Sequence, residues 1–203
     1  MTVAPVRVRM SGPERREQLL DVGRALLAER GYDGTSVEEI ALRAGVSKPV
    51  VYEHFGGKEG LYAVVVDREV SGLLARFTGA LSGESPRELV EQACLVLLTY
   101  VEEQPDGFRI LVHESPVGPR GFATLMSDVA TQVEHILGRE FAARGFATDL
   151  APLYSQALVG MVAMTGQWWQ DHRTPSRDVV AAHLVNLAWH GLSRLDPAPI
   201  LAP

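Results

Sequence analysis

The chain has 203 residues, 46% of them hydrophobic, so it can bury a sizeable core and is not disordered as a whole. Its uncharged apolar stretches, such as 95–101 and 157–163, are far shorter than the roughly 20 residues that span a membrane, and no apolar run follows Arg7 and Arg9 as a signal peptide would require. The net charge of −6 by itself argues against a nucleic-acid partner. The lone Cys94 cannot form an intramolecular disulfide, so we expect a cytoplasmic protein.

Helix-start and helix-stop signals recur from end to end, and the alternating pattern of β-strands does not interrupt them. The sequence therefore predicts an all-α fold of about nine helices. The first helix is expected over 13–30, with Ser11 as its candidate cap and Gly31 as its stop. Leucine and valine side chains recur along it at helical spacing, which predicts a buried face.

Two short helices are expected next. Thr35 and Glu38 have the spacing of a capping box, which opens the second helix. Ser47 is expected to satisfy the free N–H groups at the start of a third helix that ends near Phe55. Between them, Gly45 can take the left-handed conformation of a tight turn. Such a unit presents the second of its two helices to a DNA major groove.

Longer helices follow. Ser85 and Glu88 form a second capping-box pattern, with Pro86 at the first helical position. Proline and glycine breaks divide the rest of the chain. The six further helices are expected over 58–81, 85–104, 106–114, 120–144, 149–172 and 174–195.

The segment from about 13 to 62 resembles the N-terminal signature of the TetR (tetracycline repressor) family of transcriptional regulators. Many spaced positions agree in order, which makes the resemblance more specific than a single short motif. The residues that carry it are Thr35-Ser36, Ile40-Ala41, Ala44-Gly45-Val46-Ser47, Tyr52-x-His54-Phe55 and Lys58-Glu59-x-Leu61.

The resemblance implies a role for each matched position. Some residues would contact base edges in the major groove and others would contact DNA phosphates. The predicted base contacts are Ser47, Lys48, Pro49 and Val50, and the predicted phosphate contacts are Thr35, Tyr52, His54 and Lys58. Val51 and Phe55 would be buried, while Arg7 and Arg9 could reach an adjacent minor groove or remain solvated.

The distribution of charge agrees with this interpretation. Residues 1–60 contain nine Arg or Lys and nine Asp or Glu, whereas 61–203 contain ten and sixteen and carry the whole −6. A neutral head on an acidic body would bind DNA by the head alone. Charge by itself leaves open the alternative of an unevenly charged, solvated surface.

The resemblance also implies a division into a DNA-binding domain, 1–57, and a ligand-binding and dimerisation domain, 58–203. The family forms its homodimer by packing the last two long helices of each chain into a four-helix bundle. The alternative is that these helices only fill the monomer's own core. Apolar residues available for the bundle are Leu153, Leu158, Met161, Val162, Val180, Leu184, Leu187 and Leu195.

Central helices of the family enclose a small-molecule cavity, which implies a mainly apolar effector here. Each candidate below could equally be ordinary core. The candidate ligand contacts are Tyr100, Phe108, His113, Phe122, Met126, Met161, Met164, Gln167 and Trp168. His183, Asn186 and His190 share a helix face, but their spacing lacks a metal-binding pair, so we expect polar interface groups and no metal.

The resemblance therefore implies a ligand-responsive transcription factor, most simply a repressor that binds a palindromic operator as a dimer and is released by its effector. No cofactor is expected. An enzyme is a poor alternative, because the chain has no Gly-x-Ser-x-Gly elbow, phosphate-binding glycine loop or His-Glu-x-x-His motif. A ligand-insensitive architectural DNA-binding protein is the other alternative.

Overall fold

A computed structural model describes residues 10–80, 85–112, 122–196 and 199, and in these ranges all regular secondary structure is helical. The predicted all-α class is therefore confirmed. Within the described ranges, no helix combines the length and the hydropathy of a membrane-spanning segment. The elements are α1 (Gly12–Arg30), α2 (Val37–Ala44), α3 (Lys48–Phe55), α4 (Lys58–Ala80), α5 (Pro86–Glu103), α6 (Pro105–Val112), α7 (Phe122–Arg144), a 3-10 turn (Thr148–Leu150), α8 (Ala151–His172) and α9 (Arg177–Ser193).

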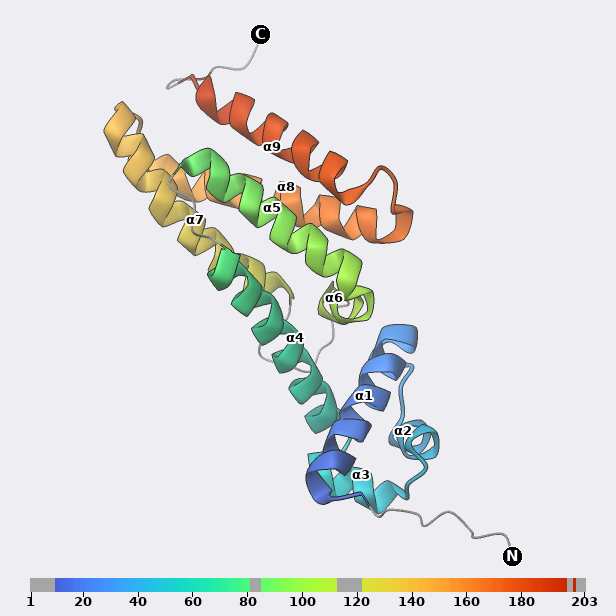
Figure 1. The fold of residues 1–203 in the computed structure, drawn as a ribbon. Coiled ribbons are helices and arrows are strands. Elements are labelled where there is room, and N and C mark those ends of the chain that lie inside the picture. The colour runs from blue at the N-terminus through green and yellow to red at the C-terminus, as the bar shows by residue number, and fades with distance from the viewer. Residues whose placement is uncertain (1–9, 81–84, 113–121, 197–198, 200–203) are drawn as a thin grey trace, which may run out of the picture.

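The helices form a small head and a larger body (Figure 1). Helices α1, α2 and α3 gather at one end of the molecule, and α9 lies at the other. Helix α4 runs from the head into the body, where α5 packs on α9 and α7 packs on α8. Helix α1 contacts both α4 and α6. The head is therefore attached to the body along two helices rather than through a single linker.

The main hydrophobic core is continuous across the head and the body. It runs from Leu19 in α1 through Leu61 in α4 and Leu97 in α5 to Leu184 in α9. Leu61 packs closely on the head, because a Cβ added at Gly23 of α1 would lie 2.4 Å from its Cδ2 atom. The boundary at 57 remains a prediction, and the packing shows that the first turns of α4 complete the core of the head.

Local signals explain most helix ends. Ser11 and Ser85 each form a reciprocal capping box, with Glu14 and Glu88 respectively, so the predicted starts of α1 and α5 are confirmed. The predicted start of the ninth helix at 174 is wrong. Ser176 is still extended, with φ −62° and ψ 158°, and α9 begins one residue later.

The predicted capping box between Thr35 and Glu38 is also wrong. Ser36 is the N-cap of α2, and its hydroxyl accepts a hydrogen bond from the Glu39 N–H at 3.2 Å. The eighth helix likewise begins later than predicted, because 148–150 form a 3-10 turn before α8.

Cys94 is fully buried in the core, which leads to a first prediction. Burial, and to a smaller extent the charge of Glu91, raises the pKa of the Cys94 thiol to about 12. At pH 8 only about one thiol in 10⁴ is then the reactive thiolate. We expect a colorimetric disulfide reagent to leave the folded protein unlabelled and to label one thiol per chain in denaturant. Rapid labelling of the folded protein would contradict this burial.

Candidate nucleic-acid interface

Helices α2 and α3 form a tight helix-turn-helix. Gly45 adopts the predicted left-handed conformation, with φ 66° and ψ 36°. The Val46 N–H then donates to the carbonyl of Ala41 at 2.9 Å, which closes the turn. Ile40 and Val51 are fully buried between the helices. Because these apolar contacts fix both helices, α3 is held rigidly on the head.

Helix α3 buries one face and leaves the other free. Val51 lies on the buried face. Four of the predicted DNA contacts, Ser47, Lys48, Pro49 and Tyr52, are exposed, and Val50 and His54 are half-buried at the edges. Figure 1 shows α3 at the end of the molecule opposite α9. The free face of α3 is thus available to an extended partner such as a duplex.

Ser47 differs from its expected capping role. It occupies the N-cap position of α3 with extended φ −85° and ψ 154°, but its side chain makes no capping hydrogen bond. The expected side-chain cap is therefore wrong. Because the exposed hydroxyl is not used inside the helix, it remains available to an external acceptor or donor.

Two predicted phosphate contacts have internal partners in this structure. Thr35 is only 2% exposed, and its hydroxyl donates to the Gly31 carbonyl at 2.8 Å. The Lys58 ammonium donates to the Tyr32 carbonyl at 3.0 Å and lies 4.0 Å from the centre of the Tyr32 ring. Both side chains therefore hold the loop between α1 and α2. Thr35 therefore has a structural role, and its hydroxyl is not accessible to a phosphate.

A polar cluster joins the head to the body. Arg24 in α1 donates to Glu69 in α4 at 2.6 Å and to Gln104 beyond α5 at 3.0 Å. The Tyr100 hydroxyl donates to the same Glu69 carboxylate at 2.6 Å. Burial, followed by the hydrogen bond to Glu69, raises the pKa of Tyr100 above its ordinary range. We call these four residues the junction cluster.

Gly107 of α6 lies directly against the junction cluster. A Cβ at this position would be 2.0 Å from the Glu69 carboxylate and 2.7 Å from the Tyr100 hydroxyl. Any larger residue at 107 would require the Glu69 carboxylate and the Tyr100 hydroxyl to move. The sequence did not predict the cluster, because its members come from three helices and the residue after α5 and have no common local motif.

The structure separates the candidate effector contacts into two groups. Tyr100 and Phe108 are buried, and Phe122, Met126 and Met161 are half-buried against the same core. Gln167 is half-buried. Met164 and Trp168 are instead 64% and 48% exposed on the outer face of α8, so they do not line a cavity inside the monomer. His113, like Arg7 and Arg9, lies outside the described residues.

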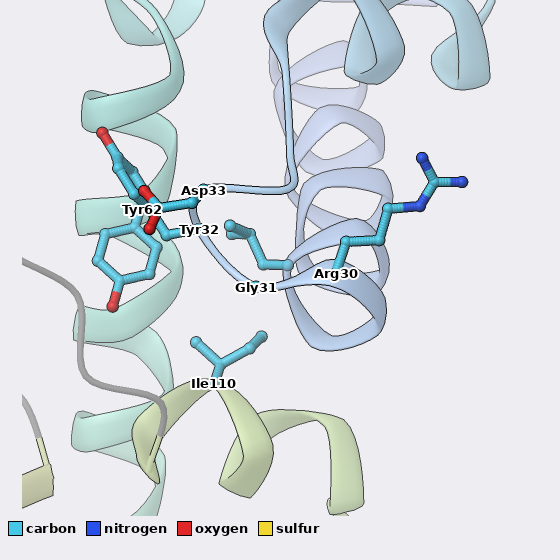
Figure 2. A pocket seen from close by; sticks show the side chains of 7 residues that line it. Arg30, Gly31, Tyr32, Asp33, Tyr62 and Ile110 are labelled. Carbon is cyan, nitrogen blue, oxygen red and sulfur yellow. The ribbon is translucent and has the colours of Figure 1, made fainter.

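A pocket of about 220 Å³ lies at the head–body junction rather than among these candidates. Figure 2 shows Tyr32 and Tyr62 on its α4 side and Ile110 of α6 across from the loop after α1. The two tyrosine rings pack edge to face with centroids 4.9 Å apart. Its lining comes from α1, α4, α6 and the loop after α1, so no local sequence pattern could have predicted it. The lining residues are Leu27, Arg30, Gly31, Tyr32, Asp33, Tyr62 and Ile110.

Helices α8 and α9 each expose large apolar side chains. On α9, Val179 is 43% and Leu187 is 64% exposed, and on α8, Leu153 is 63% exposed, as are Met164 and Trp168 at 64% and 48%. We call these five residues the α8–α9 face. His183, Asn186 and His190 are also exposed on α9.

Several residues predicted for the dimer bundle lie elsewhere. Val180 and Leu184 are each only 6% exposed and belong to the monomer's core, so their expected interface role is wrong. Met161 and Val162 are half-buried against that core, and Leu158 and Leu195 pack on a second cluster around Phe141. The periodicity of α8 and α9 predicted apolar sides but could not tell which side meets the monomer's own helices.

Two family models together match most of the chain. The N-terminal model, bacterial regulatory proteins of the tetR family, matches residues 19–65. The tetracyclin repressor-like C-terminal domain matches residues 77–199. The first match contains the helix-turn-helix, and the second contains the α8–α9 face.

Individual relatives agree with these models. The HTH-type transcriptional activator FasR of Mycolicibacterium smegmatis is 30% identical over 194 residues, which cover 92% of this chain and 87% of the relative. The HTH-type transcriptional repressor Rv3405c of Mycobacterium tuberculosis is 35% identical over 97 residues, or 46% of this chain and 50% of the relative.

Solved structures have the same fold. A TetR-like transcriptional regulator from Rhodococcus sp. RHA1 superposes with a TM-score of 0.71 at 24% identity, covering 91% of this chain and 99% of that one. The regulator PfmR from Thermus thermophilus gives a TM-score of 0.69 at 25% identity, with coverages of 92% and 100%. The chain therefore belongs to the TetR family and is a helix-turn-helix DNA-binding transcriptional regulator rather than an enzyme.

Proposed function

We propose that the chain binds a two-fold symmetric operator as a homodimer, with α3 of each protomer in a major groove. The free face of α3, on a rigid helix-turn-helix at one end of the molecule, carries this proposal. Ser47, Lys48, Pro49 and Val50 would contact base edges, and Tyr52 and His54 would contact phosphates. Lys58 would reach a phosphate only by leaving Tyr32.

The α8–α9 face supports the dimer. Its five members are large apolar side chains between 43% and 64% exposed, and they lie on neighbouring helices. Exposed apolar clusters of this kind are typical of protein interfaces. A symmetric partner would cover the face with an identical one and hold two heads about 34–36 Å apart, the spacing of successive major grooves.

The proposal extends to the effector and to the sign of regulation, that is, repression or activation. We propose a small, mainly apolar effector that binds the body and disfavours the head separation that fits DNA. A repressor that acts in the cytoplasm by covering a promoter is the simplest case, because it needs no contact with RNA polymerase. FasR is named an activator and Rv3405c a repressor, so a promoter–reporter fusion should measure the sign directly.

Selection of bound duplexes from a random pool tests the proposed function. We expect a consensus made of two inverted half-sites about one helical turn apart. A consensus without two-fold symmetry would contradict the dimer, and the absence of any consensus would contradict a sequence-specific regulator. If an operator emerges but no small molecule changes its affinity or the melting temperature, the architectural alternative holds.

Lys48→Ala tests the assignment of base contacts. Because Lys48 lies exposed in the first turn of α3, we expect its loss to relax preference at specific positions of each half-site, by about 1–3 kcal/mol per contacted base pair. The measurement is competition binding with single-base operator variants. Arg144→Ala removes the same charge from α7, at the far end of that helix, and should leave the preference unchanged. Uniform weakening on all sequences would assign Lys48 to the phosphates instead.

A further inference from the structure

An ion pair crosses the two helices of the helix-turn-helix. The Lys48 ammonium in the first turn of α3 donates to the carboxylate of Glu38 in the first turn of α2. Among the ion pairs of the described residues, this one alone includes a side chain of α3. Glu38 therefore places a negative charge beside the exposed face of α3, which we propose contacts DNA.

The pair is not required to hold the two helices together. The Lys48 and Glu38 side chains are 51% and 60% exposed, and exposed ion pairs contribute little to folding. Ile40 and Val51 already fix the crossing of α2 and α3 in a dry interface. Hydrogen bonding from Lys48 lowers the pKa of Glu38, so the carboxylate is ionised at neutral pH. A carboxylate beside the exposed face of α3 needs an explanation other than stability.

We propose that Glu38 is a specificity-determining residue that restrains Lys48 from sequence-independent contact with phosphates. This inference rests on the proposed entry of α3 into the major groove. On a random duplex, the Glu38 carboxylate offsets the positive charge that Lys48 presents to a phosphate, and it also repels the DNA backbone. Glu38 therefore weakens the electrostatic part of binding, which contains no sequence information.

At the operator, contacts to base edges offset the repulsion between the Glu38 carboxylate and the DNA backbone. A guanine presents two acceptors, O6 and N7, to Lys48, which can donate to them while it still donates to Glu38, because an ammonium has three donors. A neighbouring cytosine presents an N4 amino group that a carboxylate can accept from. Glu38 thus lowers the affinity for a duplex with a G·C pair at this position less than it lowers the affinity for other sequences.

Glu38→Gln tests the proposal, because it removes the charge while preserving the size of the side chain. We expect affinity for a scrambled duplex to rise at least about fivefold at 0.1 M salt, with the salt slope steeper by about 1 per head. Affinity for the selected operator should change less, so the ratio of operator to scrambled affinity should fall. An unchanged or higher ratio would overturn the proposal.

Glu39→Gln is the matched control. Glu39 is the next residue of the same helical turn, and its carboxylate pairs with Arg30 of α1 instead of a residue of α3. Glu39→Gln removes the same charge and should leave the ratio of operator to scrambled affinity at the wild-type value. An equal fall of the ratio in both variants would assign the effect to net charge and overturn the role of Glu38.

A double-mutant cycle with Lys48→Ala tests whether Glu38 acts through Lys48. We expect Glu38→Gln to lower the ratio in the wild-type background and to change it much less when Lys48 is absent. Additive effects would overturn the proposed restraint. These outcomes are distinct from failure of the proposed function, in which the wild-type protein itself would select no operator.

Discussion

Replacing Met164 and Leu187 together by glutamate is expected to convert the proposed dimer into a monomer and to weaken operator binding at least about a hundredfold. Both side chains belong to the α8–α9 face and are each 64% exposed in the monomer. A buried apolar side chain of this size contributes about 1.5–3 kcal/mol, and each occurs twice in a symmetric interface. Four unpaired carboxylates would replace them, at a further cost in desolvation.

Sedimentation equilibrium at micromolar protein and mobility shift on the selected operator measure the two effects. Because the residues are exposed on the monomer, we expect the variant to keep its helical circular dichroism. Leu42→Glu is a useful control for association, since Leu42 is 82% exposed on α2 and lies outside the α8–α9 face. A Met164 and Leu187 variant that remains dimeric would show that another surface forms the interface.

Glu69→Ala is expected to lower the free energy of unfolding by about 2–4 kcal/mol. The Glu69 side chain is only 12% exposed, and it accepts from both Arg24 and Tyr100. Its removal leaves a half-buried guanidinium without its ion pair and a buried hydroxyl without its acceptor. Leaving buried polar groups unpaired costs more than the loss of one hydrogen bond between exposed groups.

Glu17→Ala is the matched control for this prediction. Glu17 also joins α1 to α4, through two hydrogen bonds from Arg68 at 2.7 Å, but the two side chains are 54% and 46% exposed. Water can replace these bonds, so we expect a much smaller loss of stability. Urea unfolding of both variants makes the comparison. Equal losses would mean that the junction cluster holds the head no more firmly than a surface ion pair does.

The helix order and the helix-turn-helix could be predicted from sequence because both depend on local chemistry. Caps such as Ser11 and Ser85 act within one helical turn, and Gly45 permits a backbone conformation that most residues avoid. The wrong prediction of Thr35 as the cap of α2 shows where this local pattern is insufficient. Thr35 and Ser36 both fit a cap, and the packing of the Thr35 side chain into the head decides between them.

The junction cluster and the outer face of α8 could not be predicted, because both depend on contacts between distant segments. Arg24 and Gln104 are 80 residues apart in the chain. Trp168 and Trp169 are adjacent, yet the first is 48% and the second 1% exposed, because only one side of α8 packs on the core. A single sequence shows that such residues are apolar or charged but does not show which helix each will contact.

The close approach of Gly23 and Leu61 bears on the construction of chimeric sensors. A fusion that joined residues 1–57 to a foreign regulatory module would omit the buried residues Leu61 and Val65. Their absence would leave a cavity in the core of the head. A splice placed after Val65 retains both side chains. Folding of such a fusion then depends on whether the foreign module supplies an equivalent of α6 against which α1 can pack.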